Sequence, residues 1–159
     1  MSKYGILSFS LVACTILVTA SVIVSHPSVA KAHCEVPCGI YDDAARVKHM
    51  KEDAATIAKA MTNIHELAGK HSAQAFNQAS RWVSTKETHA TNIIGIVSQY
   101  FLTQKVKTVA RGADGYDAYL AKLADHHAVM VAAMKTKQTV DPSAVAALNK
   151  AIERLGGHY

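Results

Sequence analysis

Apolar residues recur at alternating steps of three and four positions through most of the chain, which places them on one face of a helix. The first run follows Asp42 and Asp43, either of which can cap a helix, and it ends at Gly69. Its members are Val47, Met50, Ala54, Ile57, Met61, Ile64 and Ala68. The pattern therefore predicts a long amphipathic helix between the two aspartates and Gly69.

Three further runs have the same spacing and predict three more helices. The second extends from about Gln74 to Phe101, the third follows the turn at residues 112–115, and the fourth begins at Asp141 with Pro142 in its first turn. The three apolar stripes are Phe76, Ala79, Val83, Ala90, Ile94, Val97 and Phe101; Tyr116, Leu120, Leu123, His127, Met130 and Met134; and Val145, Leu148, Ile152 and Leu155. Since only 8 of 159 residues are Gly and 3 are Pro, we expect an all-α protein with a four-helix bundle over residues 42–159.

The first 32 residues have the pattern of an export signal. Lys3 is basic, residues 6–24 carry no charge, and Pro27 ends the apolar run. Ala30-Lys31-Ala32 matches the small-x-small pattern at which signal peptidase cuts, so cleavage would leave His33 as the first residue. We expect residues 1–32 to be removed and the protein to be exported to the periplasm, the cell exterior or an organelle lumen, with no stable membrane association afterwards.

Two other interpretations of this segment remain open. Residues 6–24 are about long enough to span a bilayer, so an uncleaved anchor is one alternative. Leu11-Val12-Ala13-Cys14 resembles a lipobox, in which the cysteine is lipidated. The lipobox is disfavoured because the apolar run continues past Cys14 to Val24.

The charge balance excludes one class of partner. Without Lys3 and Lys31, the predicted mature chain keeps 15 of its 17 basic residues against 12 acidic ones. This small basic surplus is spread along the sequence rather than concentrated in a block, so a nucleic-acid interface is not expected. The surplus could still attract a small anion.

The predicted mature N-terminus has an unusual set of metal donors. The free amine of His33 and the deprotonated amide nitrogen of Cys34 would close one chelate ring on a metal, and the same amide with the Cys34 thiolate would close another. A turn at Pro37 returns Cys38 to the fourth corner of a square. Two nitrogens and two thiolates in one plane suit Ni(II) or Cu(II) rather than tetrahedral zinc. The imidazole of His33 would lie above this plane, where it could bind axially when the metal is oxidised.

Residues 33–41 closely resemble the nickel hook of the nickel-containing superoxide dismutases, whose motif is His-Cys-x-x-Pro-Cys-Gly-x-Tyr at the processed N-terminus. All six fixed positions match, as His33, Cys34, Pro37, Cys38, Gly39 and Tyr41. Ser98-Gln99-Tyr100-Phe101 is also similar to a Ser-acid-Tyr-Phe segment near the end of that family's second helix. The resemblance implies a four-helix bundle assembled as a homohexamer, a nickel cofactor, and conversion of superoxide to dioxygen and hydrogen peroxide as nickel alternates between Ni(III) and Ni(II).

The resemblance also implies a role for each matched residue. His33 would bind nickel through its amine and, in the oxidised state, its imidazole, which makes it both a ligand and a catalytic residue. Cys34 would bind through its amide and thiolate, and Cys38 through its thiolate.

Four other matched residues would shape the site and control access to it. Pro37, expected to follow a cis peptide bond, and Gly39 would set the course of the hook. Tyr41, as a catalytic residue, and Tyr100 would flank the approach to the open face of the metal.

One departure from the family concerns the group that orients the axial imidazole. In the family this is a Glu early in the first helix, whereas the corresponding stretch here reads Arg46-Val47-Lys48-His49 and is one residue shorter before it. Glu52 is a candidate substitute by its helical position alone. Because groups around a ligand fix its orientation and tune the metal, this partner stays undetermined at the level of sequence.

Three alternatives to the enzyme remain on sequence grounds. Cys34 and Cys38 could form a disulfide, which an oxidising compartment favours. The same hook could belong to an exported carrier that binds Ni(II) or Cu(II) without turnover. A weaker alternative is a cofactor-binding bundle that uses His126 or His127.

Overall fold

The computed structural model describes residues 41–159. Its contacts divide the chain into residues 1–33 and residues 34–159, and the description below concerns the second unit. The predicted signal at 1–32 and the predicted hook residues 33–40 lie outside the described residues.

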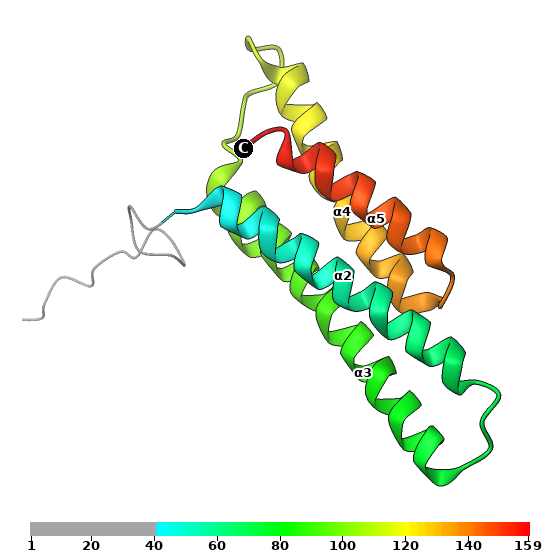
Figure 1. Cartoon of the computed structure of the whole chain (residues 1–159). Coiled ribbons are helices and arrows are strands. Elements are labelled where there is room, and N and C mark those ends of the chain that lie inside the picture. Colours follow the sequence, from blue (N-terminus) through cyan, green and yellow to red (C-terminus); the bar gives the residue numbers. More distant parts are fainter. Residues whose placement is uncertain (1–40) are drawn as a thin grey trace, which may run out of the picture. The chain divides into compact units, whose positions relative to one another are not determined.

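The described part consists of four α-helices and one π-helix (Figure 1). These are α2 (Asp43–Leu67), α3 (Ala73–Gly95), the π-helix η1 (Ile96–Lys105), α4 (Tyr116–Gln138) and α5 (Pro142–Gly156). Each α-helix packs against the next one in sequence, and α5 also packs against α2. This cycle of contacts closes a four-helix bundle, and no strand occurs between residues 41 and 159. The predicted all-α bundle is confirmed.

Side chains cap three of the helices at their N-termini. Asp42 accepts a hydrogen bond from the backbone N–H of Ala45 at 2.8 Å, and Asp141 accepts one from Ser143 at 2.9 Å. Ser72 caps α3 in the same way. Because such bonds satisfy backbone donors that have no partner inside the helix, they explain why α2 and α5 begin where the sequence predicts.

The core agrees with the predicted stripes of α2 and α5 but not with all of α3. Met50, Ile57 and Leu148 are fully buried, whereas Phe76 is 76% exposed and Val83 is 42% exposed. The loop end of the α2–α3 hairpin extends past the connection between α4 and α5 (Figure 1). The first half of α3 therefore has little beyond α2 to pack against, and part of its apolar stripe stays on the surface.

The buried face of α4 also differs from the prediction. His126, Val129, Ala133 and Thr136 are buried, while Leu120, His127 and Met134 of the predicted stripe are exposed. The predicted register is wrong because this face is built from small and polar residues. Both polar ones have partners: Thr136 donates to the Ala133 carbonyl at 2.7 Å, and the imidazole of His126 contacts Lys122 and Tyr159.

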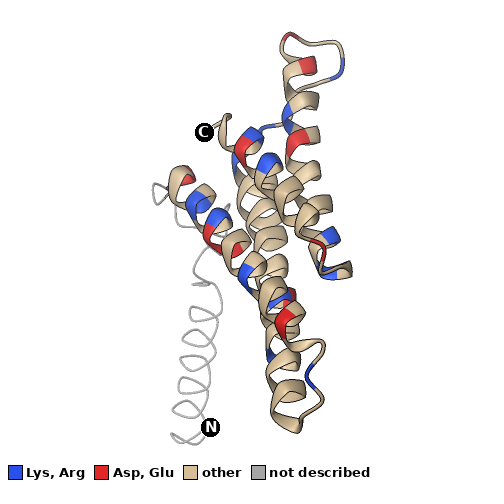
Figure 2. Cartoon of the chain, turned by 45° about the vertical axis from the view of Figure 1, so that its right-hand side comes forward, with Lys and Arg blue, Asp and Glu red and all other residues tan. Residues whose placement is uncertain are grey.

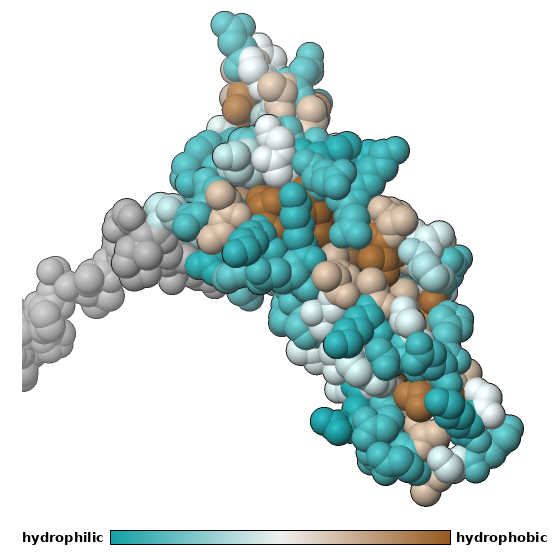
Figure 3. Space-filling model, in the orientation of Figure 1, coloured by the Kyte–Doolittle hydropathy of each residue, from teal (hydrophilic) through white to brown (hydrophobic). Residues whose placement is uncertain are grey.

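The surface mixes charge and apolar character. Lys and Arg alternate with Asp and Glu along the helices rather than forming a block of one sign (Figure 2). On the face shown in Figure 3, apolar side chains show between hydrophilic ones. None of the helices in residues 41–159 is both long and apolar enough to cross a bilayer.

Candidate metal centre

The structure brings together the two predicted site residues that it describes. Tyr41 precedes the N-cap of α2, and Tyr100 belongs to η1. Their ring centroids are 6.0 Å apart at an interplanar angle of 59°. The other predicted site residues lie outside the described part, and they are His33, Cys34, Pro37, Cys38 and Gly39. We call Tyr41 and Tyr100 the tyrosine pair.

Asp43 and Lys105 join the tyrosine pair into one polar cluster. The Tyr100 hydroxyl donates a hydrogen bond to Asp43 Oδ1 at 2.7 Å, and Lys105 Nζ lies 3.1 Å from Asp43 Oδ2. The same ammonium lies 4.6 Å from the ring centroid of Tyr41, a cation–π distance. Sequence reasoning considered Asp43 only as a helix cap and missed Lys105, because 62 positions separate the two and no motif links them.

Burial and Asp43 keep the Tyr100 hydroxyl protonated. Tyr100 is 4% exposed, and desolvation, followed by the hydrogen bond and charge of Asp43, raises its pKa to about 12. The guanidinium of Arg46 lies 5.0 Å from the centroid of the Tyr100 ring and opposes this shift in part. Tyr100 is therefore a fixed hydrogen-bond donor at neutral pH.

The π-helix η1 explains how two bulky neighbours in sequence can both be buried. Tyr100 and Phe101 are almost completely inside the bundle. Side chains support the wider turn: Thr103 Oγ1 donates to the Ser98 carbonyl at 2.6 Å, and Gln104 Nε2 donates to the Gln99 carbonyl at 3.0 Å. Short π-helical segments often occur at functional sites. The sequence predicted helix here, but not this type of helix.

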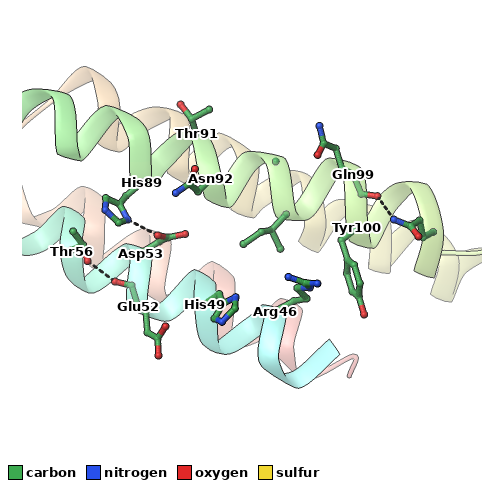
Figure 4. A pocket seen from close by; sticks show the side chains of 13 residues that line it. Arg46, His49, Glu52, Asp53, Thr56, His89, Thr91, Asn92, Gln99 and Tyr100 are labelled. Carbon is green, nitrogen blue, oxygen red and sulfur yellow. Dashed lines mark hydrogen bonds and ion pairs between the residues drawn. The ribbon is translucent and has the colours of Figure 1, made fainter. Parts of the chain in front are cut away.

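A polar groove runs between α2 and α3 beside the tyrosine pair (Figure 4). Arg46 and Tyr100 line one end, and Asp53 and His89, joined by a short hydrogen bond, line the other. Glu52 also lines the groove; its carboxylate is exposed and lies 3.9 Å from Lys48. The candidate partner for the His33 imidazole thus lines the same groove as Arg46.

The described helices do not offer a second metal centre of the usual kind. Between Tyr41 and Tyr159, no three His, Cys, Asp or Glu side chains are grouped so that they could hold a metal ion. Both ring nitrogens of His126 are engaged, one with the Lys122 carbonyl at 2.7 Å and one with the Tyr159 hydroxyl at 3.0 Å. His126 therefore has no free nitrogen for the cofactor ligation considered above.

Comparison with known proteins identifies the family. The sequence model of the nickel-containing superoxide dismutases matches residues 28–159, a range that includes the whole bundle and residues 33–41. No curated protein and no solved structure matches the chain significantly. The chain belongs to the nickel-containing superoxide dismutase family. It is an enzyme that acts on superoxide and has nickel as its cofactor.

Proposed function

We propose that His33, Cys34 and Cys38 hold the nickel ion of this dismutase once residues 1–32 are removed. The donor set fits the metal: two thiolates, an amide nitrogen and an amine are donors that suit Ni(II). As anionic donors, the thiolates and the amide would raise electron density at the metal. Nickel bound there would supply one-electron chemistry by alternating between Ni(III) and Ni(II), so that two superoxide ions and two protons give dioxygen and hydrogen peroxide.

One observation carries the assignment of the site to this end of the bundle. The ring of Tyr41, only three positions after Cys38, is close to both the ring of Tyr100 and the ammonium of Lys105. The bond from Tyr100 to Asp43 fixes the orientation of the Tyr100 ring. We assign Tyr41 to the approach of superoxide and Tyr100 to the positioning of Tyr41.

Two cations close to the tyrosine pair support attraction of an anionic substrate. Lys105 lies over the ring of Tyr41 and Arg46 over the ring of Tyr100, and clustered cations raise the local concentration of small anions. Asp43 offsets part of this charge, so the effect is local steering and not a strong binding site. The dismutation rate should accordingly fall as ionic strength rises.

We assign Glu52 as the hydrogen-bond acceptor of the His33 imidazole. Glu52 lines the groove that Arg46 and Tyr100 share, and within residues 41–159 its carboxylate makes an exposed ion pair with Lys48 and no other polar contact. Exposed pairs of this kind contribute little stability, so Glu52 can exchange partners at low cost.

Maturation and assembly follow from the same proposal. A free amine at His33 requires a cut after Ala32, which fits signal peptidase and export to the periplasm, the cell exterior or an organelle lumen. A homohexamer is proposed from the family resemblance. Exposed apolar side chains on α3 and α4, among them Phe76 and Met134, support burial in an assembly.

The Cys38→Ser variant tests the ligand assignment. Replacing one thiolate by a neutral hydroxyl removes a strong donor, so we expect almost complete loss of dismutation after nickel loading. Ser84→Ala, on the exposed face of α3, is the control and should keep full activity. Substantial residual activity in Cys38→Ser would contradict the assignment. A wild-type protein that binds nickel without dismutation would instead indicate the carrier.

A further inference from the structure

A second tyrosine site lies at the C-terminus and is not part of the proposed catalytic site. Tyr159 is the last residue, and its hydroxyl lies 3.0 Å from Nε2 of the fully buried His126. The preceding residue, His158, binds Asp125 at 2.9 Å, which anchors the end of the chain to α4. Both ends of the Tyr159–His126 contact are therefore fixed by the bundle.

The contacts of His126 determine which of its ring nitrogens carries the hydrogen and which accepts one from Tyr159. Its Nδ1 faces the Lys122 carbonyl at 2.7 Å, and a carbonyl can only accept, so Nδ1 carries the hydrogen. Burial lowers the pKa of His126, which keeps the ring neutral and leaves Nε2 as an acceptor. The Tyr159 hydroxyl consequently donates to Nε2. A phenol bonded to a neutral imidazole is an arrangement in which loss of an electron and transfer of the proton can occur together.

Aromatic contacts connect this site to the tyrosine pair. The ring of Tyr100 meets that of Phe101 edge-on, with centroids 5.1 Å apart, and Phe101 lies 4.6 Å from Tyr159. Together with the contact between Tyr41 and Tyr100, these rings form a continuous series from the residue next to the hook to the last residue of the chain. Electron transfer falls steeply with distance, so rings in contact provide an efficient route.

We propose that Tyr159, paired with His126, is a redox-active tyrosine that carries oxidising equivalents away from the hook end of the bundle. Carbonate radical, which forms when bicarbonate loses one electron to the hydroxyl radical left by one-electron reduction of hydrogen peroxide, takes one electron from the Tyr159 phenol and becomes carbonate. The O–H bond breaks as its proton moves to Nε2, which leaves a neutral phenoxyl radical and an imidazolium. Superoxide then returns one electron, the proton moves back to the phenoxyl oxygen, and dioxygen is released.

The proton acceptor favours Tyr159 over Tyr100 as the residue on which the radical settles. Nε2 of the neutral His126 ring faces the Tyr159 hydroxyl, whereas the carboxylate of Asp43, the acceptor of Tyr100, is also paired with Lys105. The ammonium of Lys122 lies 4.8 Å from the centroid of the Tyr159 ring. This cation, like Arg46 at the Tyr100 ring, disfavours a positive charge on the ring, so oxidation of Tyr159 must proceed together with loss of its proton.

The test generates the oxidant outside the protein, so its result does not depend on how nickel is bound. The proposal rests on the proposed function only for the origin of the oxidant in the cell. Carbonate radical, produced by pulse radiolysis of bicarbonate, is applied to the processed holoenzyme, and phenoxyl is followed by its absorbance and by electron paramagnetic resonance. Tyr159→Phe should lose most of the long-lived phenoxyl signal. Tyr119→Phe, which removes another partly buried tyrosine outside the ring series, should keep it.

Mapping of oxidised tyrosines by peptide mass spectrometry gives an independent answer on the wild-type protein. Oxidation concentrated at Tyr159 supports the proposal even if the Tyr159→Phe variant does not fold. An unchanged phenoxyl signal in Tyr159→Phe, or oxidation spread over Tyr116 and Tyr119 as much as Tyr159, would overturn it.

Discussion

At the scale of single residues, Asp43 has the largest influence on the described part of the site. It accepts from Tyr100 and pairs with Lys105, whose ammonium lies over the ring of Tyr41. One carboxylate at the start of α2 thus fixes two side chains of η1.

The Tyr100→Phe variant measures what this bond contributes. A hydrogen bond from a buried phenol to a carboxylate contributes about 1 to 2 kcal/mol, so the free energy of unfolding should fall by about that amount. Tyr119→Phe provides the matched control and should change stability by less than about 0.5 kcal/mol. Urea unfolding of the wild type, Tyr100→Phe and Tyr119→Phe gives the three free energies of unfolding. Equal values for the wild type and Tyr100→Phe would contradict the role given to Asp43.

Two tyrosines make stability depend on alkaline pH. The pKa values of Tyr100 and Tyr159 are raised to about 12, first of all by burial. Because the folded state holds these protons more tightly than the unfolded state, the stabilisation is fully present below about pH 10 and is lost as pH rises towards 12. Urea midpoints measured across this window should fall less in the Tyr100→Phe/Tyr159→Phe double variant than in the wild type. Parallel curves would show that the two phenols do not titrate in this way.

At the scale of elements, Lys86 of α3 donates hydrogen bonds to backbone carbonyls at the C-terminal end of α4. Lys86 is 3% exposed, and its ammonium donates to the carbonyls of Thr136 at 2.8 Å and Lys137 at 2.6 Å. The last carbonyls of a helix have no partner within it and carry partial negative charge. The ammonium of Lys86 thus caps the C-terminus of α4 and links α3 to α4.

The Lys86→Met variant tests this tie. It keeps most of the side-chain volume but leaves both carbonyls without their donor, so we expect the free energy of unfolding to fall by about 2 to 3 kcal/mol. Lys150→Met, on the exposed face of α5, should have little effect. Chemical denaturation compares the two variants, and equal small effects would mean that water replaces the ammonium at no cost.

The sequence predicted the positions of the helices better than it predicted which of their faces are buried. Apolar spacing and caps located α2 and α5, because strong periodicity and a capping aspartate act locally. The buried face of α4 was misplaced since His126 depends on Tyr159, 33 positions later. The π-helical turn around Tyr100 was not predictable either, because its bonds depend on packing and not on local preference.

At the scale of the whole molecule, the bundle and the hook have separate requirements. The bundle needs buried apolar faces, whereas the proposed hook would need a free amine and two thiolates that no periodic pattern reveals. A short motif with defined bonding chemistry predicted the hook, and the family match covers the residues of that motif. The cluster around Asp43 escaped prediction because it forms only when α2 and η1 pack together.

The central claim is that nickel chemistry begins with a free amine at His33. The direct measurement is the N-terminal sequence, nickel content and dismutation rate of the natively exported protein, beside a form that retains Ala32 before His33. We predict that the native chain starts at His33, binds one nickel per subunit and is active, and that the extended form is inactive. An active protein with Ala32 still attached, or a native chain with another first residue, would contradict the account.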